Sequence, residues 1–169
     1  MKLEIISVNK MRMLIQPLIG LKTCRKQIGY RRSLSIGFGK RIPNPSKKSR
    51  NKFYGEWEIM TYDSAWRVIK ENKIICASHD ASASLTPDDP PDIDKAFRKI
   101  QFGRLESIKR KNKWDLEVKF DSGIYIDFFA ANSNGDGGNF FVIFCPENKN
   151  ICIDVNDINN WIYEDDSMF

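Results

Sequence analysis

The sequence contains one histidine, His79, which lies between a serine and an aspartate in Ser78-His79-Asp80. Serine, histidine and a carboxylate are the groups of nucleophilic acyl transfer, but that chemistry requires them to converge in space. No G-x-S-x-G elbow marks a nucleophile elsewhere in the chain. We therefore expect His79 to be a loop histidine beside a turn-forming aspartate, and we expect the protein not to be an enzyme.

Several carboxylates alternate with apolar residues along strand-like segments. Two of them close together in a cleft could carry out acid–base hydrolysis. The alternation instead predicts that they lie on the solvent face of their strands. They are Glu56, Glu58, Asp63, Asp115, Glu117 and Asp127.

Metal and cofactor motifs are incomplete. The segment Asn132 to Gly138 has the composition of a calcium loop but lacks the twelve-residue spacing with a closing Glu, and no Lys-Ser/Thr follows its glycines to form a phosphate cradle. The four cysteines form no C-x-x-C pair, and three of them lie among apolar residues, which predicts buried free thiols. They are Cys24, Cys76, Cys145 and Cys152. We expect no metal and no cofactor.

Charge divides the chain. Residues 1–53 carry fourteen Lys and Arg and one acid, whereas residues 54–169 carry thirteen bases and twenty-one acids. The basic segment 22–53, flanked by Tyr30 and Phe53, is the best candidate for a nucleic-acid site, because it could neutralise phosphates and stack on bases. Its candidate residues are Lys40, Arg41, Lys47, Lys48, Arg50 and Lys52. The alternative is a solvated basic edge that prevents unwanted strand pairing.

Acidic residues offer a second candidate surface, suited to a basic protein partner. One group lies around the proline pair Pro90-Pro91 and the other on a predicted strand. Some of these acids could equally favour a helix N-terminus. The candidate partner-binding residues are Glu56, Glu58, Asp88, Asp89, Asp92 and Asp94.

An internal repeat predicts the elements that carry these residues. Gly20 matches Gly103, and the alternating triplet Leu34, Ile36, Phe38 matches Leu116, Val118, Phe120. The match continues in the segments that follow, so each half, about 18–78 and 101–153, is expected to form a meander of about five short strands. The sequence therefore predicts a β-dominated α+β fold with two pseudo-repeated antiparallel β-meanders.

Two connections and the covering helices complete the expected domain, 1–169. A basic loop, 39–53, replaces the tight turn Asp121-Ser122-Gly123 of the second half, and a polar linker, 78–91, joins the halves. Two or three covering helices are expected. The first spans roughly Val8 to Gln16, and a short third spans Asn156 to Tyr163. The second follows Pro91, with Asp92 as its N-cap, and places Ile93, Ala96, Phe97 and Ile100 on one face.

The strand sequences resemble those of a family of small bacterial proteins. The motifs are Ser33 to Gly39, Tyr54 to Ile59, Ala65 to Val68, the Gly103-x-Leu105 strand and Asp115 to Phe120. Proteins of this kind occur as immunity proteins beside polymorphic or contact-dependent growth-inhibition toxins. The resemblance covers most of the chain from Leu18 to Ile153.

This resemblance implies a cytoplasmic, non-enzymatic protein that occludes the active site of one cognate toxin, often a nuclease. It supplies no catalytic residues to transfer to this sequence. The long basic loop and the net charge of +5 depart from it, because a partner of a basic nuclease is expected to be acidic. We expect one protein partner, with nucleic acid as the alternative, and no membrane or small-molecule ligand.

Overall fold

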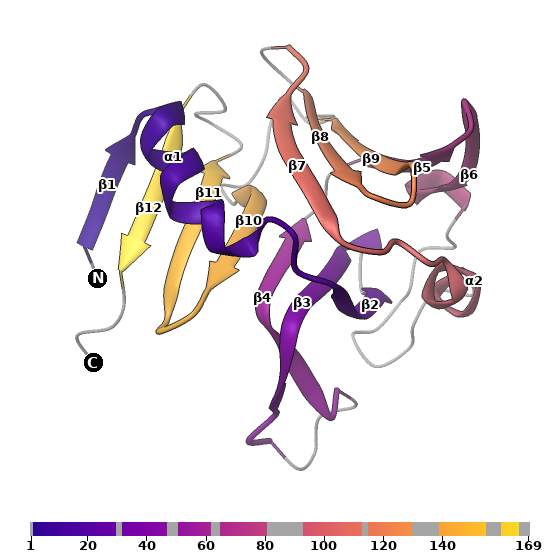
Figure 1. Cartoon of the computed structure of the whole chain (residues 1–169), viewed down its shortest axis with the longest axis horizontal. Coiled ribbons are helices and arrows are strands. Elements are labelled where there is room, and N and C mark those ends of the chain that lie inside the picture. The colour runs from indigo at the N-terminus through magenta and orange to yellow at the C-terminus, as the bar shows by residue number, and fades with distance from the viewer. Residues whose placement is uncertain are drawn as a thin grey trace.

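Two antiparallel β-sheets pack face to face and enclose the core of the protein (Figure 1). The computed structural model describes residues 2–29, 32–46, 51–61, 65–80, 93–112, 115–129, 139–154 and 160–165. The prediction of a β-dominated α+β fold is confirmed. Within the described segments, no helix has the length and apolar content needed to cross a membrane.

The larger sheet has seven strands in the order β1-β12-β11-β10-β4-β3-β2, and the smaller has five in the order β6-β5-β9-β8-β7. The strands of the larger sheet are β1 (Lys2–Ile6), β12 (Trp161–Asp165), β11 (Lys149–Asp154), β10 (Asn139–Cys145), β4 (Phe53–Thr61), β3 (Leu34–Pro43) and β2 (Thr23–Ile28). Those of the smaller sheet are β6 (Lys73–Ala77), β5 (Ala65–Lys70), β9 (Ile124–Phe129), β8 (Asp115–Phe120) and β7 (Leu105–Arg110).

The predicted repeat is present in the strand pairing. β2 pairs with β3 through Ile28↔Leu34, and β7 pairs with β8 through Arg110↔Leu116. Each pair also has a register shift at the same place, between Thr23 and Arg25 in β2 and between Leu105 and Ser107 in β7. All of these equivalent residues are 82 positions apart. The two halves therefore share their register as well as their apolar pattern.

The equivalent residues meet at the junction of the halves. Lys22 and Arg104 form an antiparallel bridge with each other. The rings of Phe38 and Phe120 stack with their centroids 6.2 Å apart and their planes 12° apart. Contacts between equivalent positions are what a two-fold relation between two halves produces.

The halves also exchange strands. Each contributes a three-stranded meander, β2-β3-β4 or β7-β8-β9, instead of a five-stranded one. The hairpin β5–β6 that follows the first meander pairs with β9 of the second, and the hairpin β10–β11 that follows the second pairs with β4 of the first. The two halves are thus interlocked, which sequence alternation could not reveal because it indicates faces and not partners.

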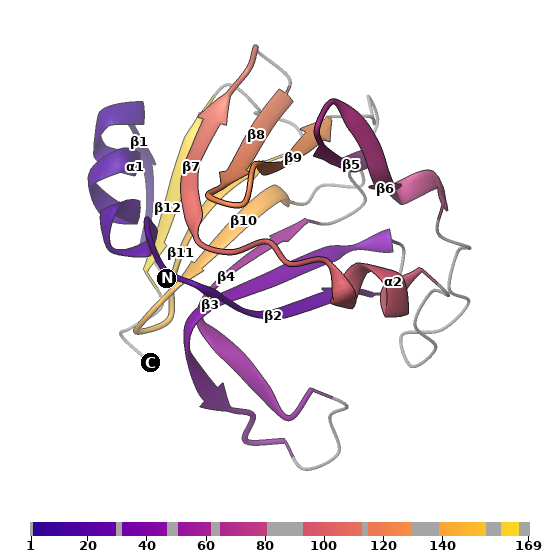
Figure 2. The same cartoon turned by 45° about the vertical axis from the view of Figure 1, so that its right-hand side comes forward.

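Two α-helices cover the ends of the sheets. α1 (Val8–Ile15) is capped by Ser7, whose Oγ accepts a hydrogen bond from the Lys10 amide, and it continues into the 3₁₀ turn η1 (Gln16–Leu18). Its buried Met11 and Ile15 pack at the β1 and β12 end of the larger sheet (Figure 2). α2 (Asp94–Lys99) buries Phe97 against Trp66 and Phe102. Both helices occur where the sequence predicted them, and the proposed cap Asp92 lies outside the described residues.

The predicted third helix is wrong over its described part. Trp161 begins strand β12, which pairs with both β1 and β11. Trp161 is buried as expected, but it lies in a sheet. A short apolar run such as Trp161-Ile162-Tyr163 fits both a helix and a strand, and tertiary pairing decides between them.

Candidate partner-binding surface

The predicted basic loop is largely a β-ribbon. β3 continues to Pro43 and β4 starts at Phe53, so the paired ends of these strands project beyond the larger sheet (Figures 1 and 2). We call residues 39–44 and 51–55 the arm. Gly39 has a φ of +75° beside the register shift that precedes Arg41, a conformation that glycine adopts without strain. The expectation of an irregular loop is wrong for this described part.

The arm is held by contacts between its two strands. Ile42 pairs with Tyr54, and these side chains are 46% and 37% exposed. The Asn44 side-chain amide donates to the Asn51 carbonyl oxygen and to the Tyr54 hydroxyl, both at 2.9 Å. The ribbon therefore has a defined shape and also exposes apolar surface.

Three of the predicted nucleic-acid residues lie on the arm. Lys40, Arg41 and Lys52 are exposed, and within the described residues none of them forms a salt bridge. The Arg41 guanidinium lies 4.5 Å from the centre of the Phe53 ring. The other three candidates, Lys47, Lys48 and Arg50, lie outside the described residues.

A groove of about 760 Å³ opens beside the base of the arm. Tyr54, Glu56 and Met60 of β4 line one side, and Phe144 and Asn150 of β10 and β11 line the other. Trp57 and Ile59, which alternate with these β4 residues, are buried in the core. The groove therefore lies on the outer face of the larger sheet, the face turned away from the smaller sheet.

An apolar row continues from the groove across this outer face. Met60, Val142, Cys152, Ile162 and Ile5 are neighbours in register on five consecutive strands. Val142 and Cys152 are buried in the middle of the row, whereas Ile5 on the edge strand is 66% exposed. A solvated sheet face usually carries polar residues at such positions. Sequence reasoning missed this row because its members come from distant segments.

Glu58 is not available to a partner in the way that was predicted. It is 8% exposed and pairs with Arg25 through Nη1 at 2.8 Å. The same carboxylate accepts a hydrogen bond from the Gly55 amide at 3.1 Å. The expectation that Glu58 faces water is wrong, because a cation two strands away covers it.

Glu56 has the opposite environment. It lines the groove, is partly exposed and accepts a 3.4 Å hydrogen bond from the Lys40 amide. No lysine or arginine among the described residues forms a salt bridge with it. Of the two predicted strand acids, Glu56 is thus the one with a carboxylate free to meet a cation.

The other predicted acids are not gathered at the groove. Asp94 is buried and accepts hydrogen bonds from the Ile28 amide at 2.7 Å and from Arg98 Nε at 2.6 Å. It therefore ties α2 to β2. Asp88, Asp89 and Asp92 lie outside the described residues.

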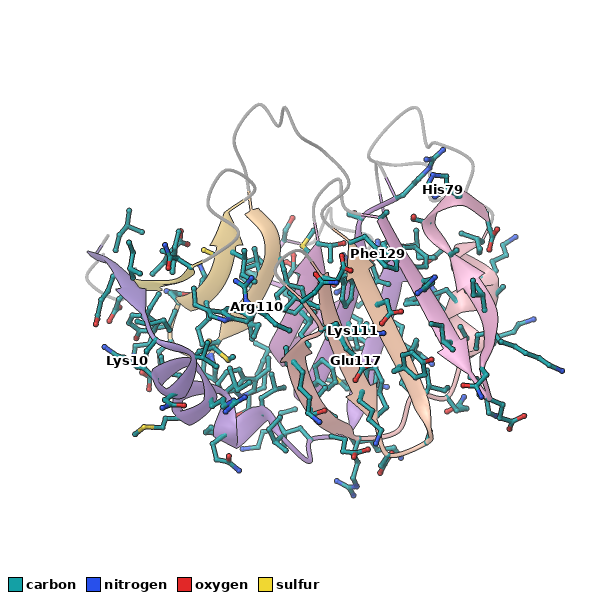
Figure 3. All side chains as sticks on the ribbon, turned by 90° about the horizontal axis from the view of Figure 1, so that it is seen from above. Lys10, His79, Arg110, Lys111, Glu117 and Phe129 are labelled. Atoms are coloured by element: carbon teal, nitrogen blue, oxygen red, sulfur yellow. The ribbon has the colours of Figure 1, made fainter. Side chains whose placement is uncertain are left out.

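A second charged cluster lies on the outer face of the smaller sheet, where Figure 3 shows Lys111, Glu117 and Phe129. At its centre Asp127 is 0% exposed and accepts hydrogen bonds from Arg67 Nε at 3.0 Å and Lys111 Nζ at 3.0 Å. The hydrogen bond that Lys111 donates to Asp127 raises the pKa of Lys111. The prediction that Asp127 faces water is wrong, because the side chains of neighbouring strands cover it. Lys111 also lies 3.7 Å from the Glu117 carboxylate, so both described acids of this cluster, Asp127 and Glu117, are paired with cations.

His79 lies on the short turn η3 (Ser78–Asp80), away from the cluster around Lys111 and Glu117 (Figure 3). It is exposed, and Asp80 accepts a hydrogen bond from the Ala77 amide, as a turn-forming aspartate does. Within the described segments no three His, Cys, Asp or Glu side chains gather to hold a metal ion.

The Cys145 thiol in the groove wall is expected to react slowly. Burial raises its pKa to about 12, so little thiolate forms near neutral pH. At about pH 8.5 we expect iodoacetamide to alkylate Cys145 roughly 10²-fold more slowly than a peptide cysteine of pKa about 8.5, because the greater nucleophilicity of a higher-pKa thiolate offsets only part of its scarcity. Peptide-resolved mass spectrometry measures the rate, and unfolding in urea should restore the peptide value. A folded-state rate within tenfold of the peptide rate would contradict this prediction.

Searches for known proteins return no match for this chain among family models, curated proteins or solved structures. The fold defines its class as a β-dominated α+β domain of two antiparallel sheets. Its candidate site is the outer face of the larger sheet with the groove and the arm.

Proposed function

We propose that the protein is a non-catalytic, protein-binding domain whose partner docks on the groove and the base of the arm. Within this class we propose an immunity protein that neutralises a cognate bacterial toxin by occluding its active site. The observation that carries the proposal is the groove, an open hollow that combines apolar and aromatic walls with the free carboxylate of Glu56.

The composition of this surface supports a protein partner. Protein interfaces combine a central apolar and aromatic area with a polar rim. Tyr54, Met60 and Phe144 provide the apolar contacts in the groove, and Asn148 and Asn150 provide polar groups beside them. Exposed Ile42 on the arm and Ile5 on β1 extend the apolar surface on either side.

The chemistry of the groove favours binding over catalysis. Glu58 is neutralised by Arg25, which leaves Glu56 without a second free carboxylate beside it among the described groove residues. The Cys145 thiol, whose pKa is raised to about 12 by burial, is a poor nucleophile near neutral pH. Glu56 is instead suited to pair with a lysine or arginine of the partner, which fixes register and speeds encounter.

Growth protection tests the proposal. A toxin domain encoded beside the gene for this chain is expressed in a bacterial host together with the chain, and the wild type is expected to restore growth. Glu56→Lys should weaken the isolated complex about tenfold or more, about 1.4 kcal/mol, because it places a cation against the partner's cation. Isothermal titration calorimetry measures the affinity.

The matched control is Glu71→Lys, which makes the same charge change on the exposed turn between β5 and β6, in the smaller sheet. It should bind the toxin as the wild type does. If the wild type gives no protection, or if both variants lose affinity equally, the proposal is overturned.

A further inference from the structure

We propose that the arm is a separate binding site for duplex nucleic acid, with Lys40, Arg41 and Lys52 contacting the phosphate backbone. This goes beyond the proposed function and does not depend on it. It starts from the shape of the arm, which extends beyond the larger sheet as a two-stranded ribbon (Figures 1 and 2).

The dimensions of a ribbon suit a duplex. Paired strands lie about 4.8 Å apart, so a two-stranded ribbon with its side chains is about 10 Å across. The major groove of B-form DNA is about 12 Å wide and accepts such a ribbon. The larger sheet behind the arm is far wider than this groove, so only the projecting part could enter it.

The sequence of the arm and of the segment joining its two strands carries charge of one sign. From Gly39 to Gly55 the sequence contains six lysines and arginines and no acid. The three cations that the structure describes there are exposed and form no salt bridge within the described residues. Residues 54–169 have an excess of acids, whereas residues 1–38 are basic. A phosphate backbone is therefore attracted to the arm and repelled by the acidic part of the chain, residues 54–169.

Contacts within the arm hold its side chains. The guanidinium of Arg41 lies 4.5 Å from the Phe53 ring centre, and the hydrogen bonds of Asn44 hold the two strands together near Tyr54. Stacking restricts the Arg41 side chain while leaving its N–H groups available for phosphate or guanine. Groups that are already ordered lose less entropy when they bind.

The test measures binding to a fluorescent DNA duplex of about 20 base pairs by anisotropy between about 50 mM and 200 mM salt. Wild-type protein is expected to bind, with affinity that falls steeply as salt increases. The triple variant Lys40→Ala/Arg41→Ala/Lys52→Ala should bind at least about thirtyfold more weakly at the lower salt. The slope of log affinity against log salt concentration should be less steep by about 0.9 for each phosphate that the variant no longer neutralises. For the three cations removed, the change is at most about 2.7.

The matched control removes three other lysines, in Lys10→Ala/Lys119→Ala/Lys149→Ala. These lysines lie outside the arm and are already paired with Glu4, Glu106 and Glu147, so duplex binding should change less than threefold. Thermal melting of both triple variants should stay close to that of the wild type, because the arm cations make no salt bridge among the described residues and the control pairs are exposed. Glu56→Lys should leave duplex binding unchanged or strengthen it, which separates this test from the one for a protein partner.

Several results would overturn the inference. One is wild-type protein that does not bind the duplex at about 50 mM salt. Others are equal losses in the two triple variants and a tenfold preference for the single strand of the same sequence. A fourth is a triple arm variant that no longer binds the toxin partner but binds the duplex as the wild type does. The arm would then be a binding site for the protein partner and not for nucleic acid.

Discussion

Replacing Phe120 by alanine is expected to lower the free energy of unfolding by about 3–5 kcal/mol, the usual cost of removing a fully buried phenylalanine. Phe120 is 0% exposed and stacks on Phe38 across the junction of the two halves. Its ring centre also lies 4.8 Å from that of Phe102. The substitution removes the ring from both of these neighbours and leaves a cavity where the sheets meet.

Urea unfolding followed by tryptophan fluorescence and circular dichroism measures this cost. The two signals should change together in one transition, because each half completes the sheet of the other through the exchanged hairpins. Phe53→Ala is the control: Phe53 is a partly exposed arm residue, and its loss should cost less than about 1 kcal/mol. A Phe120→Ala variant within about 1 kcal/mol of the wild type, or two separate transitions, would contradict the prediction.

The repeat could be predicted from sequence because it is encoded locally. Leu34, Ile36 and Phe38 alternate, and so do their counterparts, so the inner faces of β3 and β8 follow from the period of the strand. The exchange of hairpins could not be predicted in the same way. β5 would present the same alternating face to β4 or to β9, and the choice between them depends on how the whole chain folds.

The carboxylates illustrate a different limit. Alternation correctly placed Glu58 and Asp127 on outward-facing positions of β4 and β9. Whether an outward side chain meets water depends on its lateral neighbours, and these are set by register. Arg25 reaches Glu58 from β2, and Lys111 reaches Asp127 from beyond the end of β7, so both acids are covered although they point away from the core.

The candidate site lies where the two halves differ. The second half joins its strands by the tight turn Asp121-Ser122-Gly123, whereas the first half builds the arm at the same junction. Sequence comparison of the halves found this difference but predicted a loop, because Pro43 and the run of cations suggested no pairing. The groove was not predictable, since its walls come from β4 and from the β10–β11 hairpin, which are brought together by the exchange.

The buried ion pair beneath the groove leads to the second large effect. Arg25→Ala is expected to destabilise the protein by about 3–5 kcal/mol, because it leaves the Glu58 carboxylate buried without its cation. Both side chains of the pair are only 10% exposed, and Arg25 Nη1 also donates to Ser35 Oγ at 2.8 Å. Arg25 further bonds to the side chain of Gln27. Chemical denaturation measures the loss.

The double variant Arg25→Met/Glu58→Met separates the destabilisation caused by a lone buried charge from the contribution of the ion pair itself to the free energy of unfolding. It should recover most of the stability, since replacing a buried pair by apolar groups of similar size is often neutral or stabilising. The Glu58 carboxylate also holds the Gly55 amide where the arm joins the groove. Hydrogen exchange at Gly55 should therefore accelerate in the double variant although global stability returns.

If Arg25→Ala costs less than about 1 kcal/mol, or if the double variant is no more stable than Arg25→Ala, the pair does not carry the role assigned to it. A stable double variant with a fast Gly55 amide would instead show that the charges are retained at this position to fix the base of the arm and not to hold the sheet together.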